Sequence, residues 1–139
     1  MRISISKMLS LAEKYYKPKS LAHAIRVANY AFQNQQLYDY DVDEDLLFCI
    51  ALAHDLLEDT DCTEAEIEKI IDIYGLNAVK LLTKDSQITY KDYIENIVNS
   101  QNLYAIVVKR ADMKDHLSQT ETLTDKLKEK YLPVVSMLL

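Results

Sequence analysis

Apolar side chains recur every three or four residues along most of the chain, which is the pattern of helices that pack one face on a core. One such stripe consists of Leu21, Ala24, Ile25, Ala28 and Phe32. The pattern predicts helices over residues 5–16, 20–35, 44–58, 63–74, 77–82, 89–99 and 102–117, and a last helix from Thr124 past Lys128. We therefore expect an all-α fold, a compact bundle of about six to eight helices.

Several of these helices carry signals at their ends. Pro18 disfavours helical geometry in the residue before it and should stop the first helix, and Ser20 is the expected cap of the second. Thr63 and Glu66 match a capping box, in which each side chain bonds to the backbone amide of the other residue. Gly75 is expected to end the helix that this box begins.

Composition agrees with a helical protein of one domain. One Gly and two Pro in 139 residues are few for the tight turns that strand-rich folds need. The chain has no repeat, low-complexity tract or Gly/Ser linker, so we expect residues 1–139 to form a single domain.

Net charge and cysteine content limit which classes of partner and which cellular compartment fit the sequence. The net charge of −6 argues against a large basic nucleic-acid surface, although a local patch of lysines can still receive an anionic small molecule. Cys49 and Cys62 lie outside any zinc-binding spacing and indicate reduced thiols. No signal sequence is evident, and the longest apolar run, residues 46–53, is too short to cross a bilayer. We therefore expect a cytoplasmic protein, with no indication of its oligomeric state.

The stretch AHDLLEDT, residues 53–60, places an unusual cluster of polar groups on the apolar helix predicted over residues 44–58. On one continuous helix, His54 would stack on Glu58 and Asp55 on Asp59. Three carboxylates crowded in this way repel one another, and desolvation increases the repulsion. A divalent cation compensates best, because imidazole and carboxylate groups are ligands for Mn, Fe, Co, Ni and Zn.

Two further groups on apolar helices supply the ligands that such a site would still need. They are His23 in LAHAIRVA and Asp112 in AIVVKRADMKDHL. Together with the central His-Asp pair they would form a two-His, two-Asp site that leaves positions free for water and substrate, as catalytic sites do. Taken singly, His23 is also compatible with an ordinary core residue, and Asp112 with a buried ion-pair partner of Lys109 or Arg110.

The order of these residues resembles a known family. His23, His54-Asp55 and Asp112 resemble the H…HD…D signature of HD-domain metal-dependent phosphohydrolases. The blocks AHDLLEDTDCTEAEI, IYGLNAVKLLTK, YKDYIENI and VVKRADMKDHLSQT resemble the (p)ppGpp hydrolase domain of RelA/SpoT-type proteins, in its small stand-alone form. The resemblance implies an all-α HD-type bundle, a divalent ion that is commonly Mn²⁺, and hydrolysis of a phosphate ester of a nucleotide. The first candidate reaction is that of a (p)ppGpp 3'-pyrophosphohydrolase.

Position by position, the resemblance implies four metal ligands, His23, His54, Asp55 and Asp112. It implies that Glu58 and Asp59 are the catalytic pair. A carboxylate one turn beyond the ligands can orient a water molecule or take its proton.

The candidate substrate-binding residues match the family pattern less closely than the metal ligands do. They are Lys17, Lys109, Arg110 and His116. His116 stands where the (p)ppGpp hydrolases carry Asn, so one substrate-ordering contact is altered. The Arg-Lys pair that holds the guanine base in that family is replaced in residues 16–24, which keep positive charge but leave recognition of the base open.

Three other functions remain compatible with the sequence. One is a nucleotidase-type HD enzyme that acts on other nucleotides, and a second is a metal-containing nucleotide-binding protein without turnover. A third is a helical interaction module that uses some of the ten tyrosines for recognition. The presence of Glu58 and Asp59 favours an enzyme, because a structural metal site needs no extra acids beside its ligands.

Overall fold

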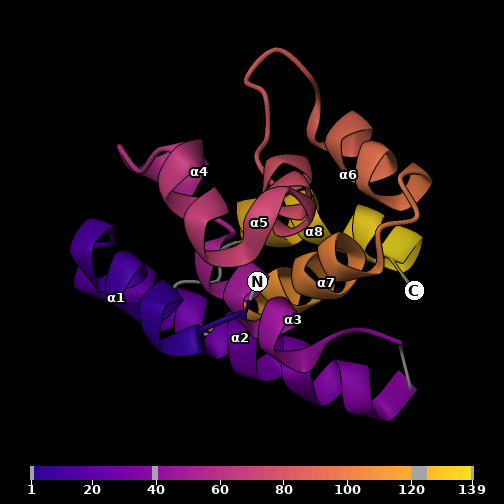
Figure 1. Cartoon of the computed structure of the whole chain (residues 1–139). Helices are drawn as coiled ribbons and strands as arrows, with labels where there is room; N and C mark the ends of the chain where they lie inside the picture. The colour runs from indigo at the N-terminus through magenta and orange to yellow at the C-terminus, as the bar shows by residue number, and fades with distance from the viewer. Residues whose placement is uncertain (1, 39–40, 120–124, 139) are drawn as a thin grey trace.

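Helices α1 to α8 and a short 3-10 helix form the secondary structure in a computed structural model that describes residues 2–38, 41–119 and 125–138. Their bounds are α1 Ile5–Tyr15, α2 Pro18–Tyr38, α3 Glu44–Ala53, α4 Leu56–Asp59, α5 Glu64–Leu81, α6 Tyr90–Asn99, α7 Leu103–Ser118, α8 Asp125–Val135 and η1 Ser136–Leu138. The described residues contain no strand, which confirms the all-α prediction (Figure 1). None of the described helices is long and apolar enough to span a membrane.

Helix α3 lies at the centre of the core. Its side chains Leu47, Ile50 and Leu52 have no solvent exposure, and each contributes about 1.5–3 kcal/mol through burial. Helices α1, α2, α5 and α7 all pack against it, and α2 also packs along α7. The apolar run of residues 46–53 therefore lies in the central helix, as predicted. His54 and Asp55, which follow it directly, are placed in the middle of the bundle.

Two capping predictions made from the sequence can be compared with the structure. Thr63 and Glu66 form the expected capping box, with each side chain bonded to the other's backbone amide at 3.2 Å. The prediction that Ser20 caps the second helix is wrong, because α2 already begins at Pro18. Proline suits the first position of a helix, where its missing N–H is not needed. Thr124, where the last helix is predicted to begin, lies outside the described residues.

The prediction of one continuous helix over residues 44–58 is wrong. Helix α3 ends at Ala53, Asp55 has the non-helical dihedrals φ −104° and ψ 0°, and α4 starts at Leu56. The buried phenol of Tyr16 stabilises this break by donating to the carbonyl of Leu52 at 2.8 Å and accepting from the N–H of Asp55 at 3.2 Å. The tyrosine thus pairs two backbone groups that an unbroken helix would pair internally.

A second difference concerns the end of the helix at Gly75. The chain bends earlier, at Asp72, which has a φ of 58° and whose carboxylate accepts the N–H groups of Tyr74 and Gly75. Helix α5 then continues to Leu81, so the prediction that Gly75 ends the helix is wrong. Gly75 is instead needed for close packing, because a Cβ atom there would lie 2.8 Å from the Cβ of Ile71.

Gly75→Ala should therefore reduce the free energy of unfolding by about 1–3 kcal/mol, since overpacking displaces Ile71. This sign is opposite to the gain of about 1 kcal/mol that alanine brings to an ordinary helix interior. Urea unfolding followed by circular dichroism measures the difference. Asn77→Ala, at an exposed position of the same helix, is the control and should leave stability unchanged or slightly higher. A stability gain in Gly75→Ala would contradict the packing argument.

Candidate metal centre

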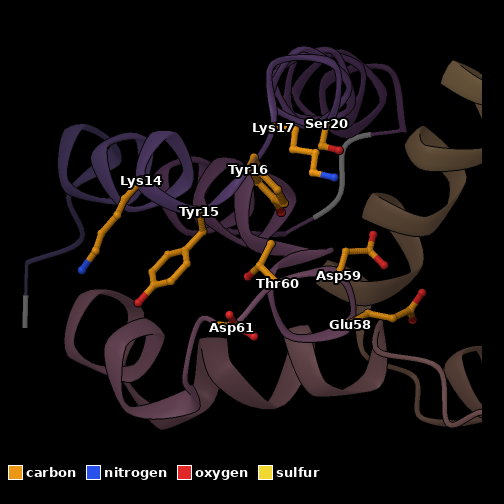
Figure 2. Close-up of a pocket in the computed structure, with 9 residues that line it drawn as sticks. All are labelled: Lys14, Tyr15, Tyr16, Lys17, Ser20, Glu58, Asp59, Thr60 and Asp61. Carbon is orange, nitrogen blue, oxygen red and sulfur yellow. The ribbon is translucent and has the colours of Figure 1, made fainter.

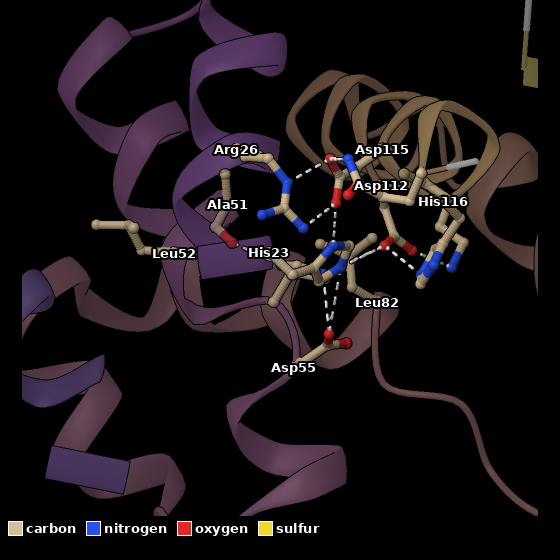
Figure 3. Close-up of polar contacts among 12 residues, drawn as sticks. His23, Arg26, Ala51, Leu52, Asp55, Leu82, Asp112, Asp115 and His116 are labelled. Atoms are coloured by element: carbon tan, nitrogen blue, oxygen red, sulfur yellow. Dashed lines mark hydrogen bonds and ion pairs between the residues drawn. The ribbon is translucent and has the colours of Figure 1, made fainter. Parts of the chain in front are cut away.

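Three segments that are distant in the sequence bring the predicted ligands together. His23 comes from α2, Asp55 from the break after α3, and Asp112 from α7 (Figure 3). His54 directly precedes Asp55 in the same break. Nε2 of His23 lies 2.9 Å from Oδ1 of Asp112 and 3.8 Å from Oδ2 of Asp55. Nε2 of His54 lies 3.1 Å from Oδ2 of Asp55 and 3.5 Å from Oδ1 of Asp112. Two imidazole nitrogens and two carboxylate oxygens thus converge on one small volume.

The environment of His54 is suited to a cation. The residue is only 2 % exposed, and its Nδ1 lies 2.6 Å from the carbonyl of Ala51, which only accepts hydrogen bonds. Nδ1 therefore carries a proton, and Nε2 supplies the lone pair when the ring is neutral. Nε2 is buried and has no hydrogen-bond partner, although two carboxylates lie nearby. A buried nitrogen aimed at carboxylate oxygens without a bond to either is the arrangement expected of a metal ligand.

The electrostatics of the cluster point the same way. Burial alone lowers the pKa of His54, but the negative charges of Asp55 and Asp112 outweigh it and raise the pKa well above its ordinary value. Burial alone raises the pKa of Asp112, but Lys109 and the neighbouring imidazoles hold it well below its ordinary value. The carboxylates thus attract positive charge, and a divalent ion can take the place of protons on the imidazoles. The N and O donors fit Mn, Fe, Co, Ni or Zn.

Glu58 and Asp59 lie beside this cluster on α4. Their carboxylate oxygens and one of Asp55 lie within 4.8 Å of one another. The crowding expected from the sequence is therefore present, although a short separate helix produces it. Glu58 accepts the backbone N–H of Lys84 at 2.6 Å, and burial together with the charges of Asp55 and Glu58 raises the pKa of Asp59.

Two cavities meet at Glu58 and Asp59. The larger has a volume of about 640 Å³, and its other lining residues include Lys14, Tyr15, Lys17, Ser20, Thr60 and Asp61 (Figure 2). The smaller has a volume of about 180 Å³ and is lined by two of the predicted ligands, Asp55 and Asp112. Its lining also includes Tyr90, Lys109, His116, Lys130 and Tyr131. Of the predicted substrate contacts, Lys17 therefore lines the larger cavity, and Lys109 and His116 line the smaller one. Arg110 is among the lining residues of neither.

Lys109 and His116 both contact the Asp112 carboxylate. Nζ of Lys109 lies 2.8 Å from Oδ2, so the ion pair considered from the sequence is present alongside the cluster. The same ammonium group lies 5.0 Å from the ring centroid of Tyr93. Nε2 of His116 lies 3.3 Å from Oδ1, and its ring stacks on Tyr131 with centroids 5.1 Å apart.

Three contributors were not predicted from the sequence. Asp115 contacts Nδ1 of His23 at 2.6 Å, and Arg26 donates to both oxygens of Asp115 (Figure 3). Arg26 follows His23 by three residues and Asp115 follows Asp112 by three, so helical spacing could have identified both. Tyr16, which supports the backbone of Asp55, has no comparable sequence signal.

Tyr16→Phe should lower the free energy of unfolding by about 1–3 kcal/mol, because a buried carbonyl and a partly buried N–H lose their partner. It should also weaken Mn²⁺ binding, because the segment that carries Asp55 loses its anchor. Urea unfolding and Mn²⁺ titration measure the two effects. Tyr104→Phe is a matched control, because the Tyr104 hydroxyl also accepts a backbone N–H, that of Asp43 at 2.8 Å, but lies away from the site. This variant should leave Mn²⁺ affinity unchanged. Equal Mn²⁺ affinity in wild type and Tyr16→Phe would contradict the anchoring role.

Comparison with known proteins agrees with this geometry. The profile of the HD domain family matches residues 20–131, which include all four predicted ligands. A solved structure of a metazoan ortholog of SpoT, which hydrolyses ppGpp and plays a role in starvation responses, superposes with a TM-score of 0.71. It is 21% identical in sequence, and the match covers 99% of this chain and 85% of that one. No curated protein sequence matches the chain. The chain therefore belongs to the HD domain family of metal-dependent phosphohydrolases.

Proposed function

We propose that the protein hydrolyses a phosphate ester of a nucleotide and that (p)ppGpp is the first substrate to test. The observation that carries this proposal is the buried, unbonded Nε2 of His54 among the Asp55 and Asp112 carboxylates. A pair of acids stands beside that cluster, where two cavities meet. The likeness to a ppGpp-hydrolysing ortholog of SpoT supports the choice of nucleotide.

We infer that a divalent ion would be held by His23, His54, Asp55 and Asp112, with Mn²⁺ the first candidate and Fe, Co, Ni or Zn compatible with the same donors. When bound, such an ion polarises a phosphoryl oxygen and lowers the pKa of water. The chain itself prepares the donors. Nδ1 of His54 is bonded to the Ala51 carbonyl and Nδ1 of His23 to Asp115, so both Nε2 atoms face the carboxylates.

Glu58 and Asp59 would divide the work on the attacking water. The Glu58 carboxylate is held by the Lys84 amide, which suits it to orient a water molecule. Asp59 has a raised pKa, because burial and two neighbouring carboxylates disfavour its charge, and this suits it to take a proton. The proton would pass from water to a carboxylate oxygen of Asp59 as the new phosphorus–oxygen bond forms. The bond from phosphorus to the ester oxygen would break in the same reaction, and the alcohol would leave after its oxygen takes a proton from solvent.

Substrate binding would use lysine and histidine side chains from both cavities. Lys109 and His116 lie beside Asp112 and would contact phosphoryl oxygens at the reacting centre. Lys17 lies in the larger cavity and would contact a more distant part of a small-molecule nucleotide. Arg110 lines neither cavity, and we assign it no contact with substrate.

The stacking of His116 on Tyr131 favours a second candidate function. The (p)ppGpp hydrolases carry Asn at this position, whereas here an imidazole occupies the wall of the smaller cavity. A different side chain in the lining of this cavity changes which nucleotide the cavity can hold. A nucleotidase-type HD enzyme that acts on other nucleotides is therefore the alternative.

The two cysteines bear on the compartment. Cys49 and Cys62 are free, buried thiols. Burial raises the pKa of Cys49 to about 12 and that of Cys62 to about 11, so both stay protonated and unreactive. Unpaired thiols are typical of a reducing compartment, and we propose that the protein works in the cytoplasm.

A substrate panel tests the proposal. It contains ppGpp, pppGpp, GTP, ATP and several nucleoside monophosphates, with Mn²⁺ present, and the control is the double variant His54→Ala/Asp55→Ala. Pyrophosphate released from ppGpp by the wild type alone would support the alarmone reaction. Orthophosphate released from monophosphates alone would move the assignment to a nucleotidase. No turnover under several metals would overturn the enzymatic proposal in favour of a nucleotide-binding protein.

A further inference from the structure

His23 is held from both sides of its ring. Nε2 faces Asp112 at 2.9 Å, whereas Nδ1 lies 2.6 Å from Oδ2 of Asp115 (Figure 3). A neutral imidazole has one N–H, and a carboxylate can only accept. If His23 is to present the lone pair of Nε2 to an ion, its proton must sit on Nδ1 and be accepted by Asp115.

Asp115 can accept that proton because Arg26 holds it. The aspartate is 1 % exposed, and a buried carboxylate without a partner would be costly. Arg26 donates from Nε to Oδ1 at 2.7 Å and from Nη2 to Oδ2 at 3.1 Å, which is a two-point contact. This geometry fixes the position of both oxygens and leaves Oδ2 directed at His23.

The two helices supply this arrangement through their spacing. His23 and Arg26 lie three residues apart on α2, and Asp112 and Asp115 lie three residues apart on α7, so each pair shares one face of its helix. Helices α2 and α7 pack along each other, which interleaves the four side chains. His23 thus lies between a predicted ligand, Asp112, and a carboxylate that is not among the predicted ligands, Asp115.

We propose that Asp115, held by Arg26, is a positioning residue that sets the tautomer and direction of His23 and thereby the affinity of the site for its divalent ion. This inference rests on the metal site of the proposed function and adds to it a relay that runs from Arg26 through Asp115 to His23. Carboxylates that orient a ligating histidine typically change metal affinity by about 10- to 100-fold when they are removed.

A purely structural clamp between α2 and α7 would behave differently. It would lower thermal stability when broken but leave the affinity of the folded protein for Mn²⁺ unchanged. The relay instead couples the contact to Nε2 of His23, so both the affinity and the coordination geometry depend on it.

Mn²⁺ titration by calorimetry at one fixed pH tests the relay in Asp115→Asn, Arg26→Met and Arg26→Lys. Asp115→Asn should weaken Mn²⁺ binding by about 10- to 100-fold. Arg26→Met should weaken it less, and Arg26→Lys least, because lysine keeps the charge without the two-point contact. The visible absorption spectrum of the Co²⁺-loaded variants should shift relative to the wild type. Glu64→Gln is the matched control, since it breaks an exposed 3.5 Å pair with Lys80 away from the site.

The outcomes separate the relay from the proposed reaction. Mn²⁺ affinities within about twofold of the wild type, with lower melting temperatures, would overturn the relay and leave a structural clamp. The Arg26 side chain is 39% exposed, so its variants decide the question if Asp115→Asn does not fold. A wild type that binds no Mn²⁺ would also overturn it. Weakened binding in the variants of a protein that turns over no nucleotide would support the relay while the proposed reaction fails.

Discussion

Asp112→Asn is expected to eliminate Mn²⁺ binding and to lower the rate of phosphate ester hydrolysis by at least about 1000-fold. Oδ1 of Asp112 lies within 3.5 Å of three imidazole nitrogens, from His23, His54 and His116. It is the oxygen that all three rings share, so no other carboxylate can replace it at the same point. Steady-state kinetics and Mn²⁺ titration measure the two losses.

The same change should lower the free energy of unfolding by about 3–5 kcal/mol, because it leaves a buried cation without its partner. Nζ of Lys109 is bonded to Oδ2 of Asp112 at 2.8 Å, and both side chains are less than a tenth exposed. The double variant Asp112→Asn/Lys109→Met should therefore recover much of the lost stability without recovering Mn²⁺ binding. Recovery of activity in the double variant would contradict the assignment of Asp112 as a ligand.

Asp59→Asn is expected to lower kcat by about 10²- to 10⁴-fold while Mn²⁺ affinity stays close to that of the wild type. Asparagine keeps the size of the side chain but cannot take a proton. Asp59 stands beside Asp55 and Glu58 and outside the group formed by His23, His54 and Asp112. Loss of turnover without loss of metal is therefore the signature expected of a proton acceptor.

Two variants provide the comparison. Glu58→Gln should have the smaller effect on kcat, because the amide oxygen of glutamine can still accept the backbone N–H of Lys84. Glu68→Gln, an exposed carboxylate on α5, should leave kcat unchanged. A kcat in Asp59→Asn close to that of the wild type would reject Asp59 as the proton acceptor. A loss of kcat accompanied by an equal loss of Mn²⁺ affinity would instead make Asp59 a metal ligand.

The candidate ligands could be found from the sequence because their local settings are distinctive. A His-Asp pair at the end of an apolar helix and single polar groups on two other apolar helices, His23 and Asp112, stand out against their neighbours. Each occupies a position that the helical pattern turns toward the core, so burial could be inferred residue by residue. The distances between these residues could not be inferred from the sequence, because they depend on how α2, α3 and α7 pack.

Backbone irregularities were the least predictable part of the fold. The break at Asp55 occurs within a run whose apolar periodicity predicts one continuous helix, and it is stabilised by the hydroxyl of Tyr16 at the end of α1. The bend at Asp72 likewise depends on a local carboxylate that pairs with the following amides. In both places a side chain offers backbone groups a partner that competes with the next helical turn.

By itself the sequence determined the helical class of the protein, the approximate extent of most helices and the identity of the acidic and imidazole groups on their buried faces. Those properties follow from hydrophobic periodicity and local capping, which depend on neighbours within a few residues. Only the tertiary structure decided that Tyr16 supports Asp55, that Arg26 and Asp115 hold His23, and that Lys109, a partner of Asp112 already considered from the sequence, also lines a cavity. Most of these contacts join residues on different helices, and their energies depend on distances that chain periodicity does not encode.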